Sequence, residues 1–260
     1  MIQRFFSQAW LNAKVHQGGL NLTEFLAFKV GVSILTLVLY VLIARFTTGY
    51  VDLTAWVVGN AFALCVYECI FGIGGTFSSE RFNGRLRSII VAPTSKLTVI
   101  MYNGASSIVT GFLTIAVSFF IGGLLFGVQF SEFDFVMFAL AIFAATFASV
   151  GLGLLLAVFA LITDSIFLML NALALLIIIF SGANFPVGQL PLFFPYIANI
   201  FPLYRSIAAA RLSIGGAFSV EFWSLLLGEV LLGFVYLLIT FLAIRIIERV
   251  ATRNAALEMF

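Results

Sequence analysis

Long apolar stretches separated by short polar breaks dominate the chain. A helix needs about 20 apolar residues to cross the hydrocarbon core of a bilayer. Six stretches have this length, and each is predicted to be a membrane-spanning helix. Their approximate bounds are 25–44, 53–77, 97–128, 133–162, 165–185 and 222–244. The pattern predicts an all-α, polytopic membrane protein in which residues 1–260 form a single transmembrane domain.

Composition and charge extend this prediction to topology. The chain is 63% hydrophobic and 9% charged, whereas a soluble domain has about 25% charged residues; membrane lipid must therefore be its main solvent. If both termini lie inside, ten of the 13 Lys and Arg residues occupy inner segments, and only Arg45, Arg205 and Arg211 lie outside. Because basic residues gather in cytoplasmic loops, we expect a multi-pass inner-membrane protein with both termini in the cytoplasm. The net charge of +2 gives no indication of nucleic-acid binding.

The first 20 residues have a different pattern. Ile2, Phe5, Phe6, Ala9, Trp10 and Ala13 fall on one face of a helix, and polar residues such as Arg4 and Lys14 fall on the other. A helix of this kind lies in the headgroup plane of the membrane. Residues 1–20 are predicted to be an interfacial helix, which is either a membrane anchor or a connecting helix that also contacts a cytoplasmic partner.

The break between the second and third stretches is the most informative polar segment. Phe82, Leu86, Ile89 and Ile90 recur at helical spacing, with Arg81, Arg85 and Ser88 on the opposite face. Pro93 ends this pattern, because proline disrupts a helix. Residues 79–93 are predicted to form a short basic helix on the cytoplasmic side. The helix is either a positive-inside topology signal or a lever that docks on another protein.

Four of the five prolines lie between the fifth and sixth stretches, within residues 185–212. This segment is too apolar for a free loop, and its prolines favour short helices that re-enter the outer leaflet. Pro186, Pro191, Pro202 and Tyr204 are candidate residues of an outer gate. A simple interfacial cap explains the same composition.

Two carboxylates, Glu68 and Glu229, lie within predicted spans. An ionisable group at the bilayer centre costs about 3 kcal/mol on insertion scales, so it faces the protein interior or a wet cavity. Each is either a protonated, hydrogen-bonded Glu that packs helix to helix, with Tyr67 or Tyr236 nearby in sequence, or a polar point on a translocation path or a proton-linked site. Glycines within 72–75 and 151–153 are expected to allow close approach of helices.

Residues needed for several chemistries are missing from the sequence. It contains no GxxxxGK(S/T) phosphate loop, so ATP hydrolysis of the P-loop type is not expected. The single histidine, His16, precedes the first span and cannot serve an intramembrane Ser-His site. Cys65 and Cys69 share one helix face and are interpreted as small hydrophobic residues, not as a disulfide or a metal site. We expect a chain with no catalytic residue, metal or cofactor of its own.

The order of these segments resembles the membrane subunit of ABC-2 type transporters over nearly the whole chain. The run from Glu80 to Pro93 is similar to the family pattern E-R-x-x-G-x-L followed by hydrophobic residues and proline. Phe185-Pro186 and Leu190-Pro191, followed by Phe201-Pro202-Leu203-Tyr204, resemble the outer segment of the family. The resemblance implies half of a transporter, which pairs with a second permease protomer and with separate cytoplasmic ATPase subunits that bind ATP and Mg²⁺.

In this family the helix that matches residues 80–92 is the coupling helix, which docks on the ATPase. By resemblance, the ATPase-coupling residues are Glu80, Arg81, Phe82, Gly84, Arg85, Leu86 and Arg87. The implied function is ATP-driven export of an amphiphilic substrate such as a drug, a lipid, a lipid-linked glycan or a peptide. The Pro-rich outer segment matches short helices that help to close the pathway.

Two other classes of function are consistent with the sequence. An ion-coupled secondary transporter would use Glu68 or Glu229, although no inverted repeat with broken helices is evident. A membrane scaffold for an assembly complex would transport nothing. An exporter predicts that cargo stimulates an ATPase, ion coupling predicts sensitivity to an uncoupler, and a scaffold predicts neither.

Overall fold

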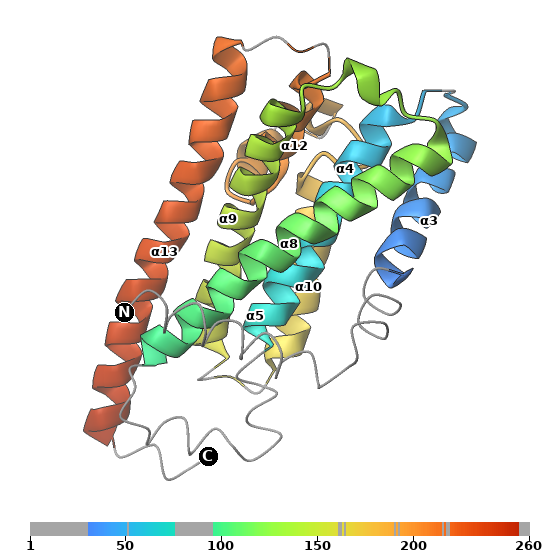
Figure 1. Ribbon diagram of the computed structural model, residues 1–260. Coiled ribbons are helices and arrows are strands. Elements are labelled where there is room, and N and C mark those ends of the chain that lie inside the picture. The colour runs from blue at the N-terminus through green and yellow to red at the C-terminus, as the bar shows by residue number, and fades with distance from the viewer. Residues whose placement is uncertain are drawn as a thin grey trace.

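Helices that run roughly along one common direction make up the computed structural model (Figure 1). The structure describes residues 31–50, 52–75, 96–160, 163, 165–189, 191, 193–214, 216 and 219–254. The main helices are α3 (Gly31–Thr48), α4 (Thr54–Val66), α8 (Lys96–Phe126), α9 (Phe135–Phe159), α10 (Ile166–Phe180) and α13 (Val220–Asn254). Within the described residues, the sole β-type pairing is an isolated bridge between Phe133 and Ile214. The all-α prediction is confirmed.

Five helices are long and apolar enough to cross a membrane, and α10 is shorter. It has 15 residues, which span about 22 Å, less than the roughly 30 Å of a hydrocarbon core. The helix ends at Phe180 because the chain turns through Gly182, whose φ is 74°, and because Ser181 Oγ accepts the amide of Ala183 at 3.2 Å. The predicted fifth span, 165–185, therefore extends too far.

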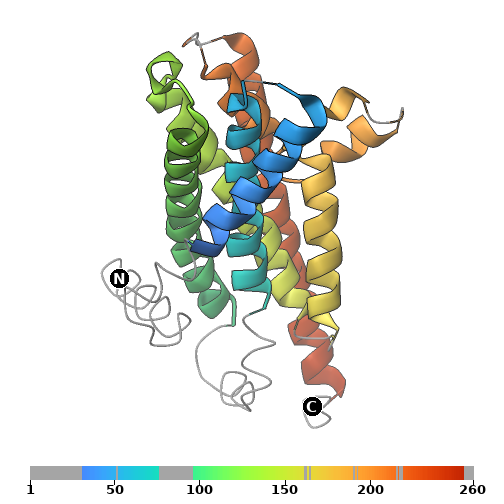
Figure 2. The same cartoon turned by 90° about the vertical axis from the view of Figure 1, so that its right-hand side faces the viewer.

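The start of α3 and the end of α13 lie at the same end of the bundle (Figures 1 and 2). This arrangement agrees with an even number of crossings. The short helix α5 (Gly72–Gly74) and the first residues of α8 lie at that end as well. The predicted interfacial helix, 1–20, and the predicted coupling helix, 79–93, lie outside the described residues.

At the opposite end, α3 is linked to α4 by a short turn. The amide of Thr54 donates to Asp52 Oδ1 at 2.9 Å, and the Thr54 hydroxyl also hydrogen-bonds to this carboxylate. These bonds lower the pKa of Asp52 below its ordinary value. A negative group is therefore fixed at the positive N-terminal end of α4, where the helix dipole favours it.

Helix α9 lies at the centre of the bundle. Its main neighbours are α13, α8 and α12, whereas the main neighbours of α3 are α4 and α8. In the spanning parts of α4 and α9, 78% of the residues are buried, compared with 17% in α3 and 22% in α13. The exposed side chains of α3 and α13 are nevertheless apolar, because lipid is their solvent.

Small residues allow α9 to approach its neighbours closely. A side-chain carbon added at Gly153 would collide with the backbone carbonyl of Cys69, and one at Gly151 would lie 3.0 Å from the carbonyl oxygen of Gly233. Such contacts are typical of helix packing in membranes, where close van der Waals contact replaces the hydrophobic effect. The expected close approach at 151–153 is confirmed. Within 72–75 it is confirmed at Gly74, where an added carbon would lie 2.7 Å from Leu170 Cδ2 of α10, whereas Gly72 has no neighbouring atom within 4 Å of an added carbon.

Candidate functional site

Residues 181–214, here called the outer segment, connect α10 with the last link before α13. They form three short helices, η4 (Val187–Gln189), α11 (Phe194–Ala198) and α12 (Tyr204–Leu212). Helix α12 packs against α9, α13 and α4, so the segment is inserted among the long helices (Figure 1). Phe180 at the end of α10 stacks on Phe194 and Phe201, with ring centroids 5.6 and 5.4 Å apart.

The four candidate gate residues occupy different environments. Pro186 and Pro191 are exposed, whereas Pro202 is buried and Tyr204 is half-buried. Tyr204 begins α12 and packs on the small apolar cluster of Phe180, Val187 and Ala198. The structure therefore brings Pro202 and Tyr204 into the bundle and leaves the other two prolines at its surface.

Glu229 in α13 faces the outer segment and is completely buried. Its Oε1 accepts a hydrogen bond from the backbone amide of Leu203 at 2.6 Å. The carboxylate thus attaches α13 to irregular backbone rather than to another long helix. Its second oxygen, Oε2, has no hydrogen-bond partner among the described residues.

Leu203 and Tyr236 complete this attachment. Leu203 has φ 83° and is the only described non-glycine residue with a positive φ. Its side chain is fully buried, so packing and the bond to Glu229 hold it in a conformation that L-residues rarely adopt. One turn before it, the carbonyl of Ile200 accepts a hydrogen bond from the Tyr236 hydroxyl. Tyr236 therefore attaches α13 to the outer segment at a second point.

Arg205 brings a positive charge close to the same place. A side-chain carbon at Gly228 would lie 2.9 Å from Arg205 Cδ, so the arginine stem passes over the residue before Glu229. Its charge acts on the Glu229 carboxylate, which also lies next to Ser206. The charge distribution places Arg205 on the outside and does not indicate its burial. The sequence holds one indication of burial, because this arginine directly follows an apolar, proline-containing run.

Arg211 at the end of α12 ties the segment to other helices. Its Nη2 atom donates to the carbonyls of Ala55 in α4, Gly182 and Ala183, at 3.1, 3.0 and 3.3 Å. Gly59 allows this approach, because a side-chain carbon there would lie 2.7 Å from the carbonyl oxygen of Ala183. The carbonyls of Gly182 and Ala183 follow the end of α10, and Arg211 gives them a hydrogen-bond donor. In apolar surroundings such backbone groups need a partner within the protein.

Glu68 lies in a second buried region, at the other side of α9. It belongs to the π-helical turn η2 (Tyr67–Phe71), which continues α4 into α5. Glu68 is buried, at 9% exposure, whereas Tyr67 is exposed and stacks on Phe71 at 5.7 Å. A π-turn widens the helix and shifts its backbone groups, and such turns often occur at functional sites. Glu68 and Glu229 lie in different parts of the bundle: η2 packs on α9, α8 and α10, whereas α13 packs on α9 and α12.

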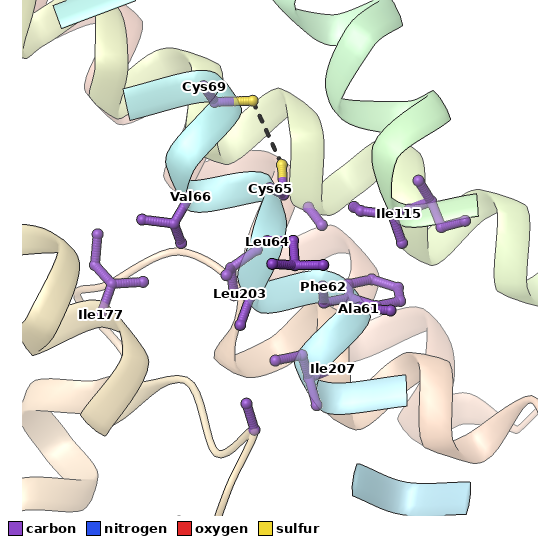
Figure 3. Close-up of a cluster of buried hydrophobic side chains, with 14 of the residues drawn as sticks. Ala61, Phe62, Leu64, Cys65, Val66, Cys69, Ile115, Ile177, Leu203 and Ile207 are labelled. Carbon is purple, nitrogen blue, oxygen red and sulfur yellow. Dashed lines mark hydrogen bonds between the residues drawn. The ribbon is translucent and has the colours of Figure 1, made fainter. Parts of the chain in front are cut away.

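The two cysteines lie in the apolar core near this turn (Figure 3). Both are free and buried, with their Sγ atoms 3.4 Å apart. They pack against Gly111 of α8. Leu203 and Ile207 of the outer segment join the same core cluster as Phe62 of α4. The part of the chain that the structure describes contains no group of three or more metal-ligating residues.

Residues 4–215 match the family described as ABC-2 type transporter. The matched range includes the predicted coupling residues and the outer segment, and it ends before α13. No curated protein matches the chain.

Proposed function

The chain belongs to the ABC-2 type transporter family, and on that premise we propose that it is the permease of an ATP-driven exporter of amphiphilic substrates. The family match over residues 4–215 carries the proposal, because it spans 212 of the 260 residues and includes the segment around Arg81 and Arg85. The membrane permease role follows from the family; the direction of transport and the amphiphilic class of cargo are the proposed part. Drugs, lipids, lipid-linked glycans and peptides all belong to that class.

The proposed energy source is a separate cytoplasmic ATPase subunit that binds ATP and Mg²⁺. Support comes from the sequence, which has no phosphate loop, and from the two described helices that flank residues 76–95. The last residues of α5 and the first residues of α8 lie at the end of the bundle where α3 begins and α13 ends. We propose that Glu80, Arg81, Phe82, Gly84, Arg85, Leu86 and Arg87 dock on the ATPase.

The described helices suggest how movement at residues 76–95 would reach the outer end. The π-turn η2 and α5 pack against α9, and α9 packs against α12 and α13. Because small residues bring these backbones into direct contact, a shift of α4–α5 cannot be absorbed by side chains alone. We propose that this connected set of helices transmits the ATPase stroke to the outer segment.

A second permease protomer, identical or homologous, is proposed to complete the pathway. The apolar faces of α3 and α13 are exposed, with Leu35 at 70% and Leu231 at 63%, so both helices have surface available for lipid or another protomer. Amphiphilic cargo suits such a protein, because it can reach the pathway from the membrane.

Ion coupling is the second candidate, and the geometry of Glu229 argues against it. Glu229 Oε1 binds the backbone amide of Leu203, which gives the carboxylate a structural partner. Transport that fails on ATP depletion and survives an uncoupler would support the exporter, and the reverse pattern would support ion coupling.

The proposal is tested by isolating the chain from its native membrane in mild detergent and identifying the proteins that co-purify. We expect a P-loop ATPase in a 1:1 ratio with the chain. The triple variant Arg81→Glu, Arg85→Glu, Arg87→Glu is expected to reach the membrane and lose the ATPase. The matched control reverses the same number of charges at Arg245, Arg249 and Arg253 and is expected to retain it. Recovery of the chain with no ATPase, or equal recovery from both triple variants, would contradict the proposal.

A further inference from the structure

The contacts between α13 and the outer segment lie deep along the helix. Glu229 and Tyr236 follow the start of α13 at Val220 by about 14 and 24 Å at 1.5 Å per residue. Their partners, Leu203 and Ile200, belong to the link between α11 and α12. This link therefore reaches toward the middle of α13.

The two sides of α12 are held by polar contacts with different elements. On the side of α4 and α10, the Arg211 guanidinium binds three backbone carbonyls, and Trp56 Nε1 donates to the carbonyl of Asn184 at 3.2 Å. On the α13 side, the Leu203 amide donates to Glu229 and the Tyr236 hydroxyl donates to the carbonyl of Ile200, and Arg205 and Ser206 also act on the Glu229 carboxylate. The attachment to α13 therefore depends on two side chains of that helix, Glu229 and Tyr236.

Leu203 makes the α13 side easier to release. Its positive φ of 83° stores strain, and strained residues persist only while the surrounding contacts hold them. If the bond to Glu229 breaks, the backbone at Leu203 can relax to a negative φ and change the direction in which α12 begins. The strain therefore favours the open arrangement, while the two hydrogen bonds favour the closed one.

Some polar atoms beside the bond from Leu203 to Glu229 are incompletely paired. Glu229 Oε2 and Arg205 Nη1 are buried atoms without a hydrogen bond among the described residues, although the charge of Arg205 acts on the carboxylate. A buried polar atom without a hydrogen bond is costly, so this attachment is weaker than a fully paired one.

We propose that Glu229 and Tyr236 form an outer latch, which holds the link at Ile200 and Leu203 against α13, and that its release opens the bundle between α12 and α13. The proposal rests on the proposed exporter function, because an exporter must open to the outside. It assigns Glu229 a positioning role: this residue acts on the outer segment through the amide of Leu203.

The experiment measures how fast a membrane-impermeant maleimide labels a cysteine placed at Ser206, in right-side-out vesicles. Ser206 is fully buried beside Glu229, and Ser206→Cys changes one atom. In this background, Glu229→Leu removes the acceptor and Tyr236→Phe removes the donor. Loss of one partner in a buried hydrogen bond is expected to raise the labelling rate roughly tenfold. Tyr236→Phe is expected to give a smaller increase in the same direction.

Conservative and matched variants separate a latch from general loosening. Glu229→Gln keeps an oxygen that accepts the Leu203 amide and is expected to label nearly as slowly as the parent. Glu221→Leu makes a similar change at an exposed position in the first turn of α13 and is expected to have no effect. Cys65 and Cys69, both fully buried in α4 and η2, serve as internal controls and are expected to stay unlabelled in every variant.

Several outcomes would overturn the latch. Equal labelling of the Glu229→Leu, Glu229→Gln and parent proteins would show that the carboxylate does not control access. Labelling of Cys65 and Cys69 together with position 206 would show that the bundle has loosened as a whole. If Glu229→Leu does not accumulate in the membrane, an unchanged rate in Tyr236→Phe overturns the proposal. The measurement needs neither cargo nor ATPase, so it can succeed where the ATPase co-purification fails, and the two proposals are tested separately.

Discussion

The outer segment and the crossing of α4–η2 with α9 are joined to the bundle by opposite means. The outer segment is held by polar side chains that reach backbone groups: Arg211 to three carbonyls, Glu229 to an amide and Tyr236 to a carbonyl. The crossing is held by close packing of the two backbones. It is possible because Gly153 has no side chain and lies against the carbonyl of Cys69.

The difference follows from the backbone of each region. A regular helix satisfies its own amides and carbonyls, so in lipid it needs only a small residue to approach another helix. The backbone of the outer segment is not helical at Gly182 and at Leu203, where φ is positive. The amides and carbonyls near these residues therefore need hydrogen-bond partners from other helices. Charged residues supply them with strong, directional bonds. A hydrogen-bonded attachment can be released when its groups bond to other partners. Closely packed backbones have no such alternative partners.

The largest effect is expected where polar attachment is removed entirely. Arg211→Ala leaves three carbonyls without their donor, so we expect the free energy of unfolding to fall by about 4 kcal/mol, given that a bond to a charged group contributes about 1.5–3 kcal/mol. The measurement is equilibrium unfolding by SDS in mixed micelles. Arg45→Ala, an identical change at an exposed residue, is the control and should alter stability by less than about 0.5 kcal/mol. Similar losses in both variants would argue against attachment through Arg211.

An intermediate effect is expected at the close-packed crossing. Gly153→Ala forces a methyl group against the backbone of η2, and overpacking of this kind costs about 1–3 kcal/mol. Gly72→Ala is the matched control, because no atom lies within 4 Å of the added carbon; there the higher helix propensity of alanine should stabilise by up to about 1 kcal/mol. The same SDS titration compares the two. If Gly153→Ala proves as stable as Gly72→Ala, the crossing has more room than the backbone contact implies.

The smallest effect is expected where the outer segment contacts the start of α9. Asp134 Oδ1 accepts the amides of Val136 and Met137 at 2.9 and 3.1 Å, while its own amide donates to the carbonyl of Ser213 at 2.9 Å. Asp134→Ala removes the cap and leaves the backbone bond, so a loss of about 1 kcal/mol is expected. Asp134→Ser retains a capping oxygen and should recover most of that loss. A larger loss in both variants would mean that the link to Ser213 also depends on the carboxylate.

Parts of the candidate site follow from sequence reasoning and parts do not. The burial of Glu229 and Glu68 inside the protein is predictable, because a carboxylate in a span cannot face lipid. The partner of Glu229 is not, because it is a backbone amide 26 residues away, made available by an unusual φ at Leu203. The roles of Arg205 and Arg211 were also missed: counting charges assigns a side of the membrane but not a depth. The predicted docking of Arg81 and Arg85 stays a prediction, since both residues lie outside the described part of the chain.

By itself, the sequence determined the helical class, the approximate spans and the family resemblance. These depend on local properties: the length of apolar runs, helix-breaking prolines, and short motifs such as 80–93. The tertiary structure alone decided that α9 is central while α3 is peripheral, that α10 stops at Phe180, and that Arg211 reaches Ala55 across 156 residues. The physical reason is that lipid and protein interior are both apolar, so hydrophobicity marks what enters the membrane but cannot distinguish a lipid-facing helix from a buried one.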